Sequence, residues 1–172
     1  LQDTVVALQH LKAATSILSE KGGYTDSLAN HLDAAKNLFI KGKYWDQYTS
    51  EFLKFTQVLY SKGFYKEGIN LLQLLQADAE ASSMNNENNE IYYQIGRGYY
   101  FQQHYDKCIA IVEANISRIE QSTTANKLEL QANHYNLLGG ALVANGSSLK
   151  AIEYYQKTLV IRKNLYGTQH TL

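Results

Sequence analysis

The feature that most limits how this chain can fold is an internal repeat. Its clearest copies lie 43 residues apart and align two glycines, Gly96 and Gly139. Around these glycines the matching stretches are Tyr92-x-x-Ile95-Gly96-x-x-Tyr99 and Tyr135-x-x-Leu138-Gly139-x-x-Leu142. Two further copies precede them, at successive offsets of 41 and 40 residues: Leu11-x-x-Ala14-Thr15-x-x-Leu18 and Phe52-x-x-Phe55-Thr56-x-x-Leu59. A fixed period in this range indicates an architecture of stacked units.

Each copy predicts a hairpin of two helices. Apolar residues recur at three- and four-residue spacing, and a glycine-rich or polar turn separates two such stretches. We therefore expect an all-α fold, with a single domain 1–172 built from hairpins near 8–48, 49–88, 89–131 and 132–172. The expected helices span residues 3–20, 25–41, 44–61, 65–82, 90–102, 105–120, 127–144 and 148–165.

Two columns of the repeat hold small residues in most units. The first reads Thr15, Thr56, Gly96 and Gly139, and the second reads Ser27, Gly68, Cys108 and Ala151. A bulky side chain in the second column would push crossing helices apart. Four residues further on stand His31, Leu72, Val112 and Tyr155. This pattern resembles the tetratricopeptide repeat over nearly the whole chain, and the resemblance implies a right-handed α-solenoid whose first helices line a concave wall.

The units depart from the usual tetratricopeptide pattern in two ways. The usual unit has about 34 residues and often a proline near its end, whereas these units are longer and the chain contains no proline. Long units of this kind are similar to those of kinesin light chains and of bacterial signalling ATPases. The closing segment 161–170 is similar to the kinesin light chain linker, with Thr171 where that linker has a proline.

Charge and composition argue against several classes of partner. The chain has 16 Lys and Arg against 16 Asp and Glu, so we expect no binding to nucleic acid. No apolar run approaches the roughly 20 residues that cross a bilayer, which predicts no membrane insertion. With one cysteine and no closely spaced histidine pair, we expect no disulfide, metal or cofactor. The start at Leu1 without a leader predicts a fragment of a longer protein. We expect that protein to be cytoplasmic, and if the chain is a sensor arm, we expect an attached output domain in the full-length chain.

The chemistry-bearing residues do not form a pattern typical of an enzyme. His104, Asp106 and Cys108 lie within five residues, and a base beside a thiol raises the thiolate fraction. However, Cys108 occupies a small-residue column of the repeat. His31 falls in a core column, where a packed histidine is the expected state, and we expect the carboxylates at solvent-facing positions rather than in an acid–base pair. The sequence therefore predicts a non-enzymatic protein.

Candidate ligand contacts come from the tetratricopeptide resemblance, which implies that certain first-helix positions face the concave wall. Arginine and aromatic side chains can grip a peptide there, and asparagine can bond both polar groups of an extended backbone. The candidates are Lys54, Gln57, Tyr93, Gln94, Arg97, Tyr100, Phe101, Asn133 and Asn136. Asn136 matches an asparagine that recurs in the kinesin light chain groove. The alternative for Tyr93, Tyr100 and Phe101 is that they only fill space between hairpins, since the chain has 14 tyrosines.

The resemblance also bears on which ligand is expected. Chaperone-binding members of the family hold a C-terminal carboxylate with a Lys/Asn/Lys/Arg clamp. Lys12 fits its first lysine, but Ser16 stands where the asparagine belongs, so this clamp is not predicted. The leading expectation is a protein-interaction module that binds a peptide or partner protein in the concave groove. The alternative is a sensor arm of a larger signalling or transcription-regulating protein, which binds a signal peptide or small effector and passes on a change of shape.

Overall fold

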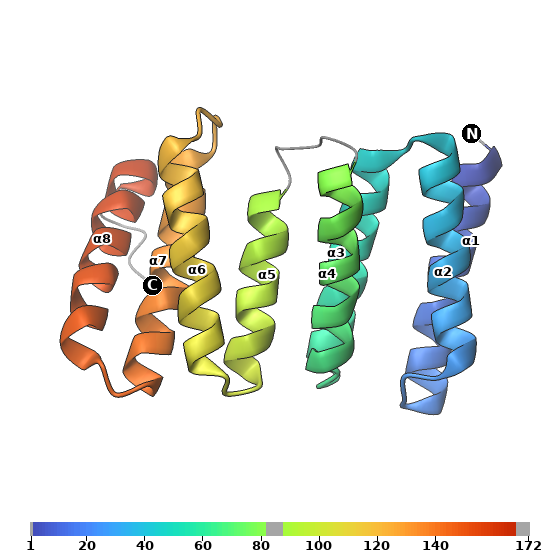
Figure 1. Cartoon of the computed structure of the whole chain (residues 1–172), viewed down its shortest axis with the longest axis horizontal. Coiled ribbons are helices and arrows are strands. Elements are labelled where there is room, and N and C mark those ends of the chain that lie inside the picture. Colours follow the sequence, from blue (N-terminus) through green and yellow to red (C-terminus); the bar gives the residue numbers. More distant parts are fainter. Residues whose placement is uncertain (1, 82–87, 168–172) are drawn as a thin grey trace. The chain divides into compact units, whose positions relative to one another are not determined.

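The computed structural model describes residues 2–81 and 88–167, and in this part of the chain it is all-helical (Figure 1). Eight helices are present in these residues: α1 (Gln2–Lys21), α2 (Asp26–Gly42), α3 (Trp45–Ser61), α4 (Tyr65–Ala81), α5 (Asn88–Phe101), α6 (Tyr105–Gln121), α7 (Lys127–Ala144) and α8 (Ser148–Tyr166). The expected helices are confirmed, with each end within two residues of its predicted position. Within residues 2–81 and 88–167, no helix combines the length and the apolar character needed to cross a bilayer.

The chain forms two compact units, residues 1–82 and 83–172. In the first unit α1 packs against α2 and α3 against α4, while α2 and α1 also contact α3. In the second unit α5 packs against α6 and α7 against α8, while α6 and α5 also contact α7. Each unit therefore has the same order of contacts: two successive hairpins, joined through the second helix of one and the first helix of the next. The expectation of a single domain divided into four repeat units stays a prediction.

The small-residue columns lie where the helices of a hairpin cross. Gly68, Cys108 and Ala151 are buried, each as the fourth residue of its helix. Gly96 lies against Val112 of α6, and Gly139 lies against the ring of Tyr155 on α8. In these hairpins the glycines allow one helix backbone to approach a large side chain of the other.

The first hairpin departs from the predicted register by one residue. Ser27 is exposed in the first turn of α2, so its placement at a helix crossing is wrong, and Leu28 is buried instead. Leu32 likewise takes the core place predicted for His31, which is half-buried. The turn before α2 is one residue longer than the turns of the other hairpins, and α2 begins at Asp26 with Thr25 as its N-cap, whose hydroxyl accepts a bond from the Leu28 amide. Ser27 is therefore the second residue of its helix, and the apolar residues Leu28 and Leu32 lie in the core instead.

One turn position has a left-handed φ in all four hairpins, although the first turn is one residue longer than the others. Gly22, Gly63 and Gly146 have φ angles of 64°, 83° and 80°, and Gln103 at the corresponding position has a φ of 61°. Glycine adopts this left-handed region without steric cost, whereas a side chain makes it unfavourable. The third hairpin therefore has this left-handed φ at a residue less suited to it.

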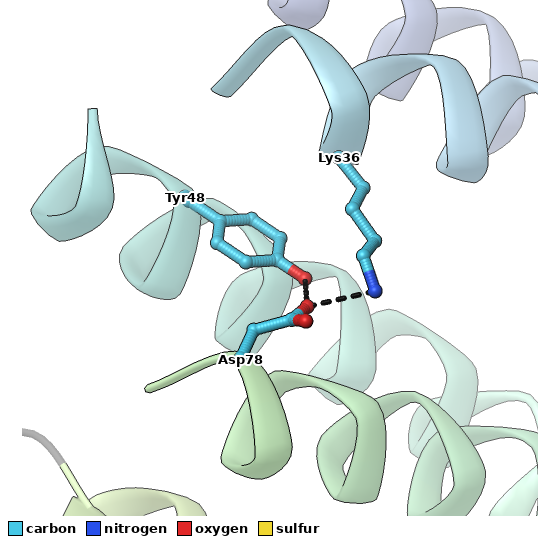
Figure 2. A network of polar contacts seen from close by, with 3 residues as sticks. All are labelled: Lys36, Tyr48 and Asp78. Carbon is cyan, nitrogen blue, oxygen red and sulfur yellow. Dashed lines mark hydrogen bonds and ion pairs between the residues drawn. The ribbon is translucent and has the colours of Figure 1, made fainter. Parts of the chain in front are cut away.

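A polar network joins three helices of the first unit (Figure 2). The Tyr48 hydroxyl of α3 donates to Asp78 Oδ2 of α4 at 2.7 Å, and Lys36 Nζ of α2 lies 2.8 Å from the same oxygen. Burial of the Tyr48 ring, and secondarily its bond to Asp78, raises the pKa of Tyr48 above its usual range. Because Tyr48 stays protonated, its hydroxyl donates a hydrogen bond to the same Asp78 oxygen that pairs with Lys36.

Candidate binding surface

Arg97 is the centre of the candidate surface on α5. Tyr93 and Phe101 flank it at four-residue spacing, and the guanidinium carbon lies 6.0 Å from the Tyr93 ring centroid and 5.6 Å from that of Phe101. Residues four apart lie on one helix face, so α5 alone assembles this aromatic–cation row. We call Tyr93, Arg97 and Phe101 the α5 row.

Two successive side-chain hydrogen bonds along α5 also orient Arg97. Arg97 Nη1 donates to Gln94 Oε1 at 3.0 Å, and Gln94 Nε2 donates to Glu90 Oε1 at 2.7 Å. Burial raises the pKa of Glu90, while the bond from Gln94 and the charge of Arg97 act in the opposite direction. The expectation that the carboxylates lie at solvent-facing positions is therefore wrong for Glu90. Gln94 itself is only 2% exposed, so it positions Arg97 from beneath the surface.

Helix α7 contacts α5 beside the α5 row. The Tyr93 ring lies 5.2 Å from that of His134, and burial raises the pKa of Tyr93. Tyr100 passes over Gly140 and stacks edge-on against Tyr105 at 5.7 Å. Of the two candidate asparagines on α7, Asn133 is half-buried and Asn136 is exposed.

Lys54 and Gln57 belong to the first unit and are both exposed on α3. Lys54 Nζ pairs with Glu51 at 2.7 Å. It also lines, with Lys12, a shallow cavity of about 240 Å³ between α1 and α3, whose floor includes Leu11 and Phe55. The structure thus brings Lys54 together with Lys12, whereas Gln57 is not among the residues that line this cavity.

A buried histidine network in the second unit was not predicted from the sequence. His134 Nδ1 lies 2.7 Å from the Leu130 carbonyl, and its Nε2 lies 2.7 Å from Asn115 Nδ2, which also donates to the Asn89 carbonyl. These contacts assign the neutral tautomer with the proton on Nδ1. Burial lowers the pKa of His134, outweighing the bond to Leu130. The Asn115 Oδ1 atom is buried without a partner.

A second unpredicted feature is a wider cavity on the side of α7 and α8. It measures about 580 Å³ and is lined by residues that include Leu128, Val160 and Lys157. Lys157 Nζ lies over two rings, 5.5 Å from Tyr135 and 5.0 Å from Tyr154. Burial, followed by the bond to Glu120, raises the pKa of Tyr135 to about 12. Sequence spacing offered no signal for this cavity, because it depends on how α7 and α8 pack against each other.

The residues near Cys108 do not make an activated thiol. Cys108 is buried, and burial raises the pKa of its thiol to about 12, so it stays protonated near neutral pH. His104 is exposed and its ring lies 6.4 Å from that of Tyr99. In the two described ranges, no three side chains of His, Cys, Asp or Glu gather in a way that would hold a metal ion.

No protein-family model and no curated protein matches this chain. A proposal for its function therefore rests on the fold and the repeat.

Proposed function

We propose that the chain is a non-enzymatic protein-interaction module of tetratricopeptide type, which binds an extended peptide along the α5 row and α7. The repeated close approach at Gly96 and Gly139, and the left-handed φ at one turn position of all four hairpins, support the repeat assignment. The right-handed stacking of four hairpins belongs to the same proposal. A repeat that contacts only its neighbours leaves an extended surface for a ligand.

The observation that carries the proposal is the environment of Arg97. Arg97 is half-buried, and its guanidinium is flanked by two rings and oriented by Gln94. Within residues 2–81 and 88–167 no carboxylate lies within ion-pair distance of it. An arginine held in one orientation loses little entropy when it binds and presents its remaining donors as a fork. A carboxylate is the ligand group that such a fork matches best.

The ligand chemistry follows from the neighbours of Arg97. Tyr93 and Phe101 offer aromatic surface to an apolar side chain. Asn133 and Asn136 offer amides to a peptide backbone. We therefore propose a peptide that carries one acidic residue and one apolar anchor, bound with moderate dependence on salt.

Binding of a fixed-position peptide library tests this function. One library fixes an acidic and an apolar residue, and a matched library fixes a basic residue in place of the acidic one. Calorimetry then measures the affinity of the peptide that binds most tightly. Arg97→Ala combined with Asn136→Ala should weaken binding by more than about 2 kcal/mol, because it removes charge-assisted and backbone hydrogen bonds at a desolvated site. Arg97→Lys should lose an intermediate amount, since it keeps the charge but not the planar fork.

Arg118 provides the matched control, because its guanidinium also lies over a tyrosine, 4.5 Å from the Tyr92 centroid, but on α6. Arg118→Ala should leave binding unchanged. Equal affinity for the acidic and basic libraries, or full affinity in the folded Arg97→Ala/Asn136→Ala variant, would show that the α5 row is not the binding surface.

A further inference from the structure

Gly140 lies in the interior of α7 at a place where the packing leaves room for a side chain. The nearest atom to an added Cβ would be Tyr100 Cε2 at 3.5 Å, which is ordinary contact. Packing explains the neighbouring Gly139, whose added Cβ would lie 2.7 Å from the Tyr155 ring, but it does not explain Gly140. Glycine in a helix interior makes a fold less stable than alanine does. A residue that lowers stability without a packing reason points to function.

In the internal repeat, Gly140 occupies the column to which Arg97 belongs. At the successive offsets of 43, 40 and 41 residues its equivalents are Arg97, Gln57 and Ser16, all with polar side chains. Arg97 and Gln57 are candidate ligand contacts. Gly140 is half-buried, so part of its backbone is open to solvent. Helix α7 therefore offers bare backbone where the equivalent position of α5 offers the arginine of the α5 row.

Two tyrosine hydroxyls border the space over Gly140. The added Cβ would lie 3.6 Å from the Tyr100 hydroxyl of α5 and 3.7 Å from the Tyr155 hydroxyl of α8. Neither hydroxyl has a hydrogen-bond partner within residues 2–81 and 88–167. Burial, and secondarily the nearby Tyr100, raises the pKa of Tyr155, so its hydroxyl stays protonated and can donate. Two O–H groups from different helices therefore adjoin one spot of bare backbone.

This arrangement selects the kind of group that fits over Gly140. The group must accept two hydrogen bonds, because each hydroxyl can donate one. It must also come close to a helix backbone, which is the approach that glycine permits. A peptide carbonyl oxygen has two lone pairs and meets both conditions. A carboxylate is better matched by the charged fork of Arg97, which leaves the uncharged hydroxyls to a carbonyl.

We propose that the main chain of the bound peptide crosses α7 at Gly140, where one of its carbonyl oxygens accepts hydrogen bonds from the Tyr100 and Tyr155 hydroxyls. This inference rests on the proposed function and names the point at which the ligand lies closest to the protein. It makes Gly140 a specificity-determining residue, because any side chain there would fill the space of the ligand backbone. It also adds Tyr155 of α8 to the binding surface.

Gly140→Ala tests this inference, with the tightest-binding peptide of the acidic library as the probe. Calorimetry should show at least about tenfold weaker binding, because the added methyl group occupies the place of the carbonyl. The urea midpoint of the same variant should rise, because alanine suits a helix interior better than glycine. A loss of affinity in a more stable protein cannot come from unfolding.

Phenylalanine substitutions test the two donors. Tyr100→Phe with Tyr155→Phe keeps both rings and removes both hydroxyls, so it should also weaken binding about tenfold. Tyr105→Phe is the matched control, since Tyr105 is half-buried on α6 and its ring lies 5.7 Å from that of Tyr100. Tyr105→Phe should leave the affinity unchanged.

Ester replacement in the probe locates the carbonyl. Each amide of the peptide is replaced by an ester in turn, which weakens the carbonyl oxygen as an acceptor. One position should lose affinity for the unmodified protein, and that loss should disappear in the Tyr100→Phe/Tyr155→Phe variant, because the donors are then absent.

The outcomes separate this inference from the proposed function. Full affinity in Gly140→Ala or in the double phenylalanine variant would overturn the inference, while a loss in Arg97→Ala would still support the α5 row. Full affinity in Arg97→Ala with a loss in Gly140→Ala would overturn the α5 row and support the inference. A library that yields no binder would overturn both.

Discussion

Replacing Gly96 by alanine tests whether close helix packing explains the repeat glycines. In a helix interior this change normally stabilises a protein by about 1 kcal/mol, because glycine loses more backbone freedom on folding. Here the added Cβ would lie 2.8 Å from Val112 Cγ2 and 3.3 Å from Leu137 Cδ2. Val112 is fully buried and β-branched, so it cannot move aside. Overpacking costs about 1–3 kcal/mol, and we expect a net loss of up to about 2 kcal/mol.

Gly140 on α7 supplies the control for this substitution. Its added Cβ would lie 3.5 Å from Tyr100 Cε2, which is ordinary contact. Gly140→Ala should therefore show only the backbone effect and gain about 0.5–1 kcal/mol. Urea unfolding followed by circular dichroism measures both changes as shifts of the midpoint. If Gly96→Ala stabilises the protein as much as Gly140→Ala does, the close approach to Val112 does not explain the glycine.

Three further predictions concern single sites. Ala151→Leu should cost about 1–3 kcal/mol by overpacking a helix crossing, and an unchanged urea midpoint would contradict the assigned column. Gln103→Gly should gain up to about 1 kcal/mol because it relieves a left-handed φ, while a lower melting temperature would argue against strain at this turn. Burial lowers the pKa of His134 in the folded state, so its contribution to stability is present above about pH 6.5 and is lost as pH falls below it. That loss should shrink in His134→Gln, and an equal loss in both proteins on acidification would assign it to other groups.

The helices and their ends were predictable because each hairpin repeats one strong periodic pattern. The register of α2 was predicted wrongly because the repeat spacing was carried through a turn that is one residue longer than the others. The apolar residues of the helix itself, Leu28, Leu32, Ala35 and Phe39, recur at three- and four-residue spacing and are the buried ones. The buried face of this helix therefore follows from its own apolar pattern and not from the alignment of the repeat.

The sequence predicted which candidate residues share one face of α5, but not how deeply each of them is buried. Tyr93, Arg97 and Phe101 share a helix face by spacing alone, whereas the depth of Gln94 depends on neighbouring helices. The contact between Asn115 and His134 joins residues 19 apart in the sequence. It requires α5, α6 and α7 to be packed first. A polar residue within the apolar stripe of α6, between Val112 and Ile119, was the one signal that Asn115 had a buried partner.

The division into two compact units determines what fluorescence can report about this protein. The only tryptophan, Trp45, begins α3 and its ring lies 6.4 Å from that of Tyr48 in the first unit. Tryptophan fluorescence therefore follows the unfolding of the first unit and does not report on the second, which has no tryptophan. Circular dichroism, in contrast, reports on the helices of both units. Because repeat proteins can lose one part before another, a separation of the two signals during denaturation would resolve the units without any added label.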